Sequence, residues 1–221
     1  MKRNAKKNLL LGAGLLLFFI LWTVLVMTFD VKSVGVEGTN VGFAALNSTV
    51  HKLTGTNMTL YNITDWLGLV PIFVCFVFAG VGLCHLIKRR SLLKVDIDII
   101  FLGIYYIIVI AAYLVFEMIP INYRPVLING YMEVSYPSST TLLVLCVMPT
   151  LSFQAKRIDN RYIRNVIKIL SAIFSVFMVT GRLISGVHWL SDIIGSVFFS
   201  FGLFCIYKGV SVWSLEKNYR N

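Results

Sequence analysis

Six stretches of the chain contain few charged residues and are dominated by Leu, Ile, Val and Phe. They cover residues 9–29, 67–87, 97–119, 139–153, 165–184 and 189–207. A helix needs roughly 20 apolar residues to cross the hydrocarbon layer, and most of these stretches approach that length. The pattern therefore predicts an all-α, polytopic membrane protein with six transmembrane helices. The fourth stretch is the shortest, so its boundaries are the least defined.

The first apolar stretch follows a basic segment, MKRNAKK, as a signal peptide would. Its apolar run of about 20 residues is longer than the core of a usual signal peptide, and it has no clear small-residue cleavage site. We therefore expect a retained first helix. The longest connection follows it, at residues 30–65, where residues 41–53 have the pattern of a short amphipathic helix lying on the membrane surface.

Composition limits the domain organisation. Hydrophobic residues make up 57% of the 221 residues and charged residues only 14%, whereas soluble domains average roughly 25% charged residues. We therefore expect a single membrane-embedded domain over residues 1–221. The cysteines lie in apolar runs without metal-binding spacing, so we expect buried, unpaired side chains at Cys75, Cys84, Cys146 and Cys205.

Lysine and arginine are distributed unevenly between the two sides of the predicted bundle. With a cytoplasmic N-terminus, the outer side carries four of the 20 basic residues, namely Lys32, Lys52, Arg124 and Arg182. This is the positive-inside distribution of a chain with both termini in the cytoplasm. The excess of basic residues, which gives the net charge of +10, is thus explained by the orientation of the chain in a cell membrane. The expected partner is the lipid bilayer, not nucleic acid.

The segment GRLISGVHWLSD, residues 181–192, combines Arg182, His188 and Asp192 at one outer edge. On a helix, His188 and Asp192 would share a face because they are four residues apart. The carboxylate would then accept from one imidazole nitrogen and leave the other free as a base or nucleophile. Arg182 adds a fork of donors that suits phosphate. Alternatively, these are ordinary polar residues at the ends of two helices.

A second polar group lies on the same predicted side, around Arg124 and the start of the fourth stretch. Pro137 precedes four hydroxyl residues, 138–141. A helix N-terminus offers unpaired N–H groups and a favourable dipole to an anion. Taken alone, the hydroxyl groups are explained by N-capping. Together with two arginines and the His–Asp pair, they predict a phosphate-binding cradle that contains a nucleophile.

The order of these motifs resembles the type-2 phosphatidic acid phosphatase superfamily, the lipid phosphate phosphatases. The family's third motif, Ser-Arg-x5-His-x3-Asp, is similar to residues 181–192, with Gly in place of Ser. The first, Lys-x6-Arg-Pro, is similar to residues 117–125, and the second, Pro-Ser-Gly-His, is similar to residues 137–140. The resemblance covers a family-like core of about residues 97–207.

The resemblance implies a lipid phosphatase that acts at the outer membrane face. His188 would attack phosphorus and form a phosphohistidine, and Asp192 would orient and stabilise it. The family uses no metal, and we expect no cofactor. The phosphoryl oxygens would be held by Arg124, Arg182, Ser138 and the backbone N–H of Ser139.

Two positions depart from the family's pattern. Thr140 replaces a histidine that protonates the leaving group, and a threonine hydroxyl cannot be a general acid near neutral pH. An alcohol leaving group has a pKa of roughly 16, whereas the second pKa of phosphate is about 6. A polyprenyl diphosphate is therefore the favoured substrate. Glu117 replaces a lysine, and either pairs with Arg124 or acts as an acid with a raised pKa.

Several alternatives stay open. Phosphatidylglycerophosphate or phosphatidate is the next substrate class. A catalytically impaired family member that binds or transports a phospholipid is the competing functional class, because of Glu117 and Thr140. A structural membrane subunit is a third, although it leaves the polar residues unexplained. Nothing in the sequence sets an oligomeric state.

Overall fold

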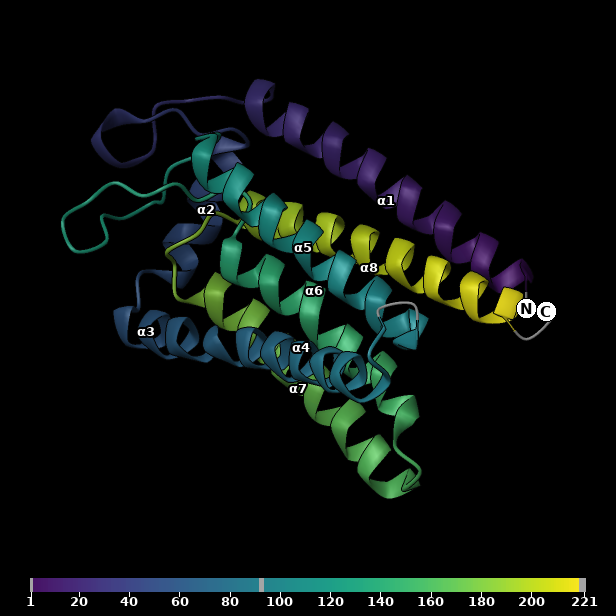
Figure 1. Ribbon diagram of the computed structural model, residues 1–221. Coiled ribbons are helices and arrows are strands. Elements are labelled where there is room, and N and C mark those ends of the chain that lie inside the picture. Colours follow the sequence, from purple (N-terminus) through teal and green to yellow (C-terminus); the bar gives the residue numbers. More distant parts are fainter. Residues whose placement is uncertain (1, 92–93, 219–221) are drawn as a thin grey trace.

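The computed structural model describes residues 2–91 and 94–218, whose regular structure is helical (Figure 1). Five helical segments in these ranges are long and apolar enough to cross a membrane. The prediction of an all-helical, multi-pass membrane protein is therefore confirmed. The five segments are α1 (Lys2–Thr28), α3 (Met58–Leu67) continuing into α4 (Leu69–Arg89), α5 (Ile97–Met118), α7 (Arg161–Ile184) and α8 (Leu190–Asn218).

The fourth predicted span corresponds to α6 (Ser139–Gln154), which has only 16 residues. A helix of this length rises about 24 Å, which is less than the roughly 30 Å of the hydrocarbon layer. Figure 1 shows α6 inside the bundle, and it contacts α4, α5, α7 and α8. Its side chains Val144, Cys146 and Val147 are fully buried. Since other helices cover most of the surface of α6, its length need not match the thickness of the lipid.

Hydrogen bonds within the bundle join α6 to its neighbours. The Tyr106 hydroxyl on α5 lies 2.7 Å from the hydroxyl of Thr150. On the other side, the Ser200 hydroxyl of α8 donates to the carbonyl of Leu142 over 3.1 Å. In a membrane interior such bonds hold helices together because polar groups there lack water as a partner.

Helices α1 and α8 lie side by side along most of their length (Figure 1). Small residues make this close approach possible. A β-carbon at Gly12 would lie 2.8 Å from the carbonyl oxygen of Gly202, and one at Gly202 would lie 2.9 Å from Leu16. The beginning of α1 and the end of α8 lie at the same end of the bundle, which we call the termini end.

The opposite end of the bundle carries the long connections. The predicted surface helix at 41–53 corresponds to α2 (Ala44–Thr54), which follows the short 3₁₀ helix η1 (Val36–Gly38). Asn47 of α2 is fully buried. Its side-chain amide donates to the hydroxyl of Ser191 over 2.9 Å. Helix α2 thus packs on the beginning of α8, close to the Arg182–Asp192 segment.

At the termini end, charged residues are paired. Asp96 accepts from Arg89 and Arg157, which are 2.7 and 2.9 Å away. Arg157, in the 3₁₀ helix η3 (Ala155–Arg157), also binds Asp98. Hydrogen bonds from Arg157 and then Arg89 hold the pKa of Asp96 below its ordinary value.

The cysteines are free, as predicted, but the expectation that all are buried is wrong. Cys146 on α6 is buried, whereas Cys84 is exposed on α4. An apolar run that spans a membrane has an outward face, because lipid can surround it just as protein can.

Candidate functional site

The polar residues of the 181–192 segment meet at the end of the bundle opposite the termini. Arg182 lies in the last turn of α7, His188 lies in the connection that follows, and Asp192 lies in the first turn of α8. Residues 119–138, between α5 and α6, cover them and bring Arg124 to the same place. Arg182, His188 and Asp192 are all at most 3% exposed, and Arg124 is 7% exposed.

His188 contacts groups from three parts of the chain. Its Nε2 lies 3.3 Å from Nη2 of Arg182. Its Nδ1 lies 3.2 Å from the carbonyl oxygen of Ser135, an acceptor that calls for a proton on Nδ1. This tautomer leaves the lone pair on Nε2, next to the guanidinium group.

The charge state of His188 follows from the same surroundings. Burial, and then the positive charges of Arg124 and Arg182, lower the pKa of His188 well below its ordinary value. The imidazole is therefore neutral at neutral pH. A neutral ring with a lone pair on Nε2 has the form that a nucleophile needs.

The prediction that His188 and Asp192 share one face of a helix is wrong. The structure begins α8 at Leu190, so His188 precedes the helix. The Oδ2 atom of Asp192 accepts from the backbone N–H of Trp189 over 2.9 Å, in the manner of a capping box. That oxygen lies 3.7 Å from Nδ1 of His188, which is close for charges but long for a hydrogen bond.

The other carboxylate oxygen of Asp192 accepts a hydrogen bond from the 119–138 segment. Its Oδ1 accepts from the side-chain amide of Asn122 over 3.2 Å. Asp192 therefore holds both the 185–189 connection and the 119–138 segment in place beside His188.

The two arginines converge on one aromatic ring. The guanidinium carbon of Arg182 lies 4.8 Å, and that of Arg124 5.6 Å, from the ring centre of Tyr61 on α3. Two buried guanidinium groups repel each other at this separation unless negative charges lie nearby. Asp65 Oδ1 lies 3.6 Å from Arg182 Nη1, and Glu133 Oε2 lies 3.1 Å from Arg124 Nε.

Both guanidinium groups keep unused donors. Within residues 2–91 and 94–218, Arg182 Nε and Arg124 Nη1 are buried without a hydrogen-bond partner. Buried donors of this kind are costly unless an acceptor satisfies them. An anion with several oxygens, such as phosphate, would supply such acceptors.

The hydroxyl residues at the start of α6 are only partly connected to this centre. Ser138 is the N-cap of α6, and its backbone N–H lies 3.4 Å from the carbonyl oxygen of Asp192. Its hydroxyl donates to Thr141 over 3.0 Å. Ser139 and Thr140 are half-buried, and the methyl group of Thr140 would lie 3.4 Å from a β-carbon at Gly68.

Glu117 is exposed on the last turn of α5. In the part of the chain that the structure describes, the residue that pairs with Arg124 is Glu133 and not Glu117. The option that Glu117 pairs with Arg124 is therefore wrong.

Sequence reasoning missed the contribution of α3. Tyr61 and Asp65 contact the arginines, and the hydroxyl of Thr64 lies 3.5 Å from Arg182 Nη1. The sequence did contain one signal for the start of α3. Asn57 is a typical N-cap residue, and in the structure its side chain accepts from the backbone N–H of Leu60. The contacts themselves depend on how α3 packs against α7, which the local pattern does not encode.

Among the described residues, His, Cys, Asp and Glu do not gather in groups of three or more that could hold a metal ion. The donor set at the centre instead consists of guanidinium and imidazole nitrogens and backbone N–H groups. Such a set suits an anion.

Comparisons with known proteins bear on the family. Residues 119–215 match the model of the PAP2 superfamily. A similar fold is found in the crystal structure of the first transmembrane PAP2-type phosphatidylglycerolphosphate phosphatase from Bacillus subtilis. That structure has a TM-score of 0.65 and 17% identity, and the match covers 91% of this chain and 96% of that one. No curated protein matches the sequence. The segment that carries Arg124, Arg182, His188 and Asp192 therefore matches the PAP2 superfamily model, and the whole chain has a fold similar to that of a PAP2-type protein.

Proposed function

We propose that the chain is a lipid phosphate phosphatase whose nucleophile is His188. The observation that carries the proposal is a buried, neutral imidazole whose Nε2 lies 3.3 Å from one of two converging arginines. The match of residues 119–215 to the PAP2 superfamily model supports phosphatase activity. The apolar helices support a substrate that reaches the site from the bilayer.

In the proposed binding step, a phosphate group replaces internal partners of the arginines. Its oxygens accept from Arg124 and Arg182, including the unused donors at Arg124 Nη1 and Arg182 Nε. Arg182 Nη2 then leaves His188 Nε2 for a phosphate oxygen. Ser138 and the backbone N–H of Ser139, at the beginning of α6, add donors and a favourable helix dipole.

In the proposed chemical step, the lone pair of His188 Nε2 forms a bond to phosphorus. The bond from phosphorus to the leaving oxygen breaks, and that oxygen keeps the electron pair. The imidazole becomes positively charged, with Nδ1–H bonded to the Ser135 carbonyl and the Asp192 carboxylate 3.7 Å away. Water then attacks phosphorus, the P–N bond breaks, and inorganic phosphate leaves.

The leaving group decides the substrate class that fits best. Thr140 stands where the family has its acid, and its methyl group packs near Gly68. A leaving phosphate, with a second pKa of about 6, needs little protonation, whereas an alkoxide with a pKa of roughly 16 needs much. A polyprenyl diphosphate, which gives its monophosphate and inorganic phosphate, is therefore the proposed substrate. Glu117 is the remaining carboxylate candidate for a proton donor.

The experiment is a phosphate-release panel on purified protein in detergent. The substrates are a polyprenyl diphosphate, phosphatidylglycerophosphate and phosphatidate. We expect release to be fastest from the diphosphate, to be lost in His188→Ala, and to leave a phosphate adduct on the His188 peptide in trapped wild-type enzyme. Faster release from either monoester would overturn the diphosphate assignment, and unchanged release by His188→Ala would overturn the nucleophile.

A second function is favoured by the carboxylates at the site. Asp65 and Glu133 already neutralise the two arginines, and Thr140 supplies no acid. A chain that binds or transports a phospholipid without hydrolysing it would need only the cradle. The same panel separates the two: lipid binding without phosphate release, unaffected by His188→Ala, supports this alternative. The relative from Bacillus subtilis, a phosphatidylglycerolphosphate phosphatase by its title, supports that lipid as the next substrate to test.

We also infer that residues 1–221 form one membrane-embedded domain that crosses the membrane six times. Both termini lie in the cytoplasm and the His188 site faces the outside of the cell membrane. The position of Lys and Arg along the sequence supports this orientation. So does the location of the start of α1 and the end of α8 at the end of the bundle away from His188 (Figure 1).

A further inference from the structure

A groove opens between α6, α7 and α8, away from the His188 site. Helices α7 and α8 diverge from the 185–189 connection towards the termini end, and α6 lies between them (Figure 1). The groove has a cavity volume of about 850 Å³. Its walls are mainly apolar, with Met148 and Pro149 from α6, Val176 from α7, and Phe201 and Phe204 from α8.

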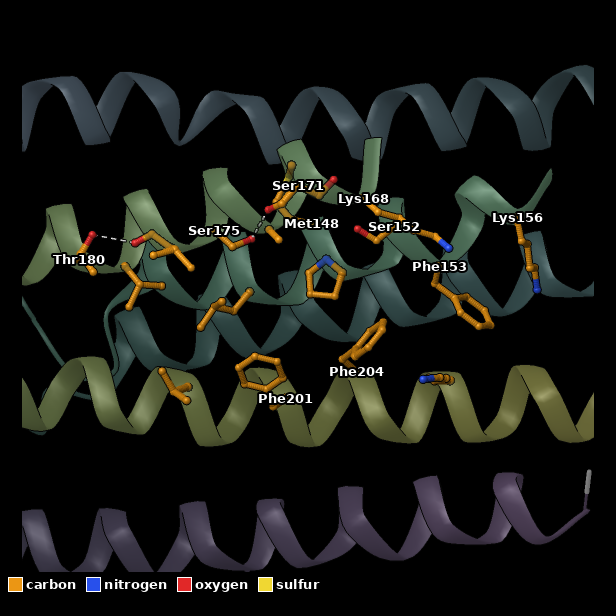
Figure 2. A pocket seen from close by; sticks show the side chains of 17 residues that line it. Met148, Ser152, Phe153, Lys156, Lys168, Ser171, Ser175, Thr180, Phe201 and Phe204 are labelled. Atoms are coloured by element: carbon orange, nitrogen blue, oxygen red, sulfur yellow. Dashed lines mark hydrogen bonds between the residues drawn. The ribbon is translucent and has the colours of Figure 1, made fainter. Parts of the chain in front are cut away.

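The groove has one charged end. Figure 2 shows Lys156 and Lys168 at one end of the lining and Thr180 at the other. Lys208 of α8 also lines the groove, so three elements each contribute one lysine. The positive-inside rule explains why lysines occur on this side. It does not explain why lysines from three elements line the same groove.

The positive charge of the groove is not balanced locally. Lys156 lies 3.7 Å from Asp98, but that carboxylate is already bound by Arg157. Among residues 3–91 and 94–214, whose side chains the structure describes, no carboxylate lies at ion-pair distance from Lys168 or Lys208. Charge complementarity therefore calls for an anion at this end of the groove.

A polar atom in the groove also lacks a partner. Ser171 is 3% exposed, and within the described residues its hydroxyl forms no hydrogen bond. It lies three residues after Lys168, so both side chains share a face of α7. The neighbouring hydroxyls of Ser175 and Thr180 are bonded to carbonyls of their own helix. The free donor thus lies between the lysines and the apolar part of the groove.

The dimensions match one leaflet. From Lys168 to Thr180, α7 rises about 18 Å, which is slightly more than half of the roughly 30 Å hydrocarbon thickness. The exposed side chains of Val176 and Phe201 line the groove at this depth, so it opens towards the bilayer.

We propose that this groove binds one anionic phospholipid of the adjoining leaflet. Its phosphate binds Lys156, Lys168 and Lys208, an ester carbonyl accepts from the Ser171 hydroxyl, and an acyl chain lies between α7 and α8 towards Thr180. The bound lipid fills the space between the diverging helices and so stabilises the bundle. The site is separate from the His188 centre and does not depend on the proposed phosphatase activity.

The test is the melting temperature of full-length protein in detergent, titrated with phosphatidylglycerol or phosphatidylcholine. We expect phosphatidylglycerol to raise the melting temperature of the wild type in a saturable way, and phosphatidylcholine to have little effect. The double variant Lys168→Gln/Lys208→Gln should need at least a tenfold higher phosphatidylglycerol concentration for half of the effect. Ser171→Ala, which changes no charge, should need a two- to threefold higher concentration.

The matched control is Lys7→Gln/Lys88→Gln, which removes the same charge from exposed lysines of α1 and α4 that do not line the groove. We expect it to stay within twofold of the wild type. Equal weakening by both double variants would overturn the proposal in favour of a diffuse basic surface, and equal stabilisation by both lipids would overturn it as well. A dimer that Phe201→Ala dissociates would overturn it by assigning the groove to a second copy. Elution as a single species and unchanged helicity establish that each variant folds.

Discussion

His188 is a histidine whose surroundings keep it uncharged. Its ring is buried against Arg182, and Arg124 adds a second positive charge, so its pKa in the folded protein lies well below the 6.5 of the free side chain. In the unfolded chain the imidazole of His188 is exposed to water and has the ordinary pKa of a free histidine side chain. Proton uptake by His188 below about pH 6.5 is therefore coupled to unfolding.

This coupling predicts how stability depends on pH. As the pH falls below about 6.5, the unfolded chain binds a proton at His188 that the folded chain does not bind, so folding stability falls. The loss is at most about 1.4 kcal/mol per pH unit. We expect the melting temperature of the wild type in detergent to fall more between pH 7.5 and 5.5 than that of His188→Asn. Between pH 7.5 and 8.5 the two should change alike; equal losses on acidification would contradict the prediction.

For individual residues, the sequence predicted that Arg182, His188 and Asp192 lie close together, but it did not predict all of their contacts. Spacing within residues 181–192 was sufficient to bring Arg182, His188 and Asp192 together, because a short connection between two helices leaves little freedom. The role of Asp192 was not predictable in detail, because its contact with Trp189 depends on where α8 begins. Tyr61 could not be assigned to the arginines from a pattern more than 60 residues away.

Among the helices, the close contact of α1 and α8 is the most specific packing feature. Gly12 faces the backbone of Gly202, so a side chain at that position would push the two helices apart. Two residues along the same helix, Gly14 has open space around its α-carbon. The two glycines of α1 therefore form a matched pair for mutation.

Gly12→Ala would place a β-carbon 2.8 Å from the Gly202 carbonyl oxygen and from a side-chain carbon of Ile206. Since backbone cannot move aside cheaply, we expect a loss of about 1–3 kcal/mol. Gly14→Ala should be neutral or stabilising, because alanine favours helix over glycine by roughly 1 kcal/mol. Melting temperatures in detergent measure both. Similar values for the two variants would show that α1 and α8 do not pack as described.

Helix prediction from hydrophobic pattern succeeded where length and apolarity coincide, as in α1, α5 and α7. It began the second helix at residue 67, whereas the helical path starts at Met58, because α3 contains polar residues that contact the site. It predicted residues 139–153 as a membrane helix like the others, but it did not show that most of the surface of α6 packs against α4, α5, α7 and α8. Hydropathy records that a segment is buried but not whether lipid or protein buries it.

For the molecule as a whole, the two ends of the bundle differ in chemistry. One end carries His188 with the connections that cover it, and the other carries the chain termini and paired charges around Asp96 (Figure 1). The proposed orientation places the first end outside the cell. Tyr131, 75% exposed in the 119–138 segment, and Asp159, exposed between α6 and α7, mark the two sides.

The orientation is tested by labelling with a membrane-impermeant maleimide in intact cells. In a chain with its four cysteines replaced by alanine, we expect Tyr131→Cys to react at once and Asp159→Cys to react only after permeabilisation. The reason is that the bilayer blocks the charged reagent from the cytoplasmic side. The reverse order would place the His188 site in the cytoplasm. Reaction of both positions in intact cells would show that α6, the helix between them, does not cross the membrane.

The guanidinium group of Arg182 lies against Nε2 of His188 and occupies the direction from which this nitrogen would attack. In the proposed mechanism, a terminal phosphate with two or more anionic oxygens draws the arginine away and frees the lone pair. A phosphodiester, which most lipids of a bilayer carry, has one anionic oxygen and attracts the arginine less. The proposed enzyme would therefore leave those lipids intact.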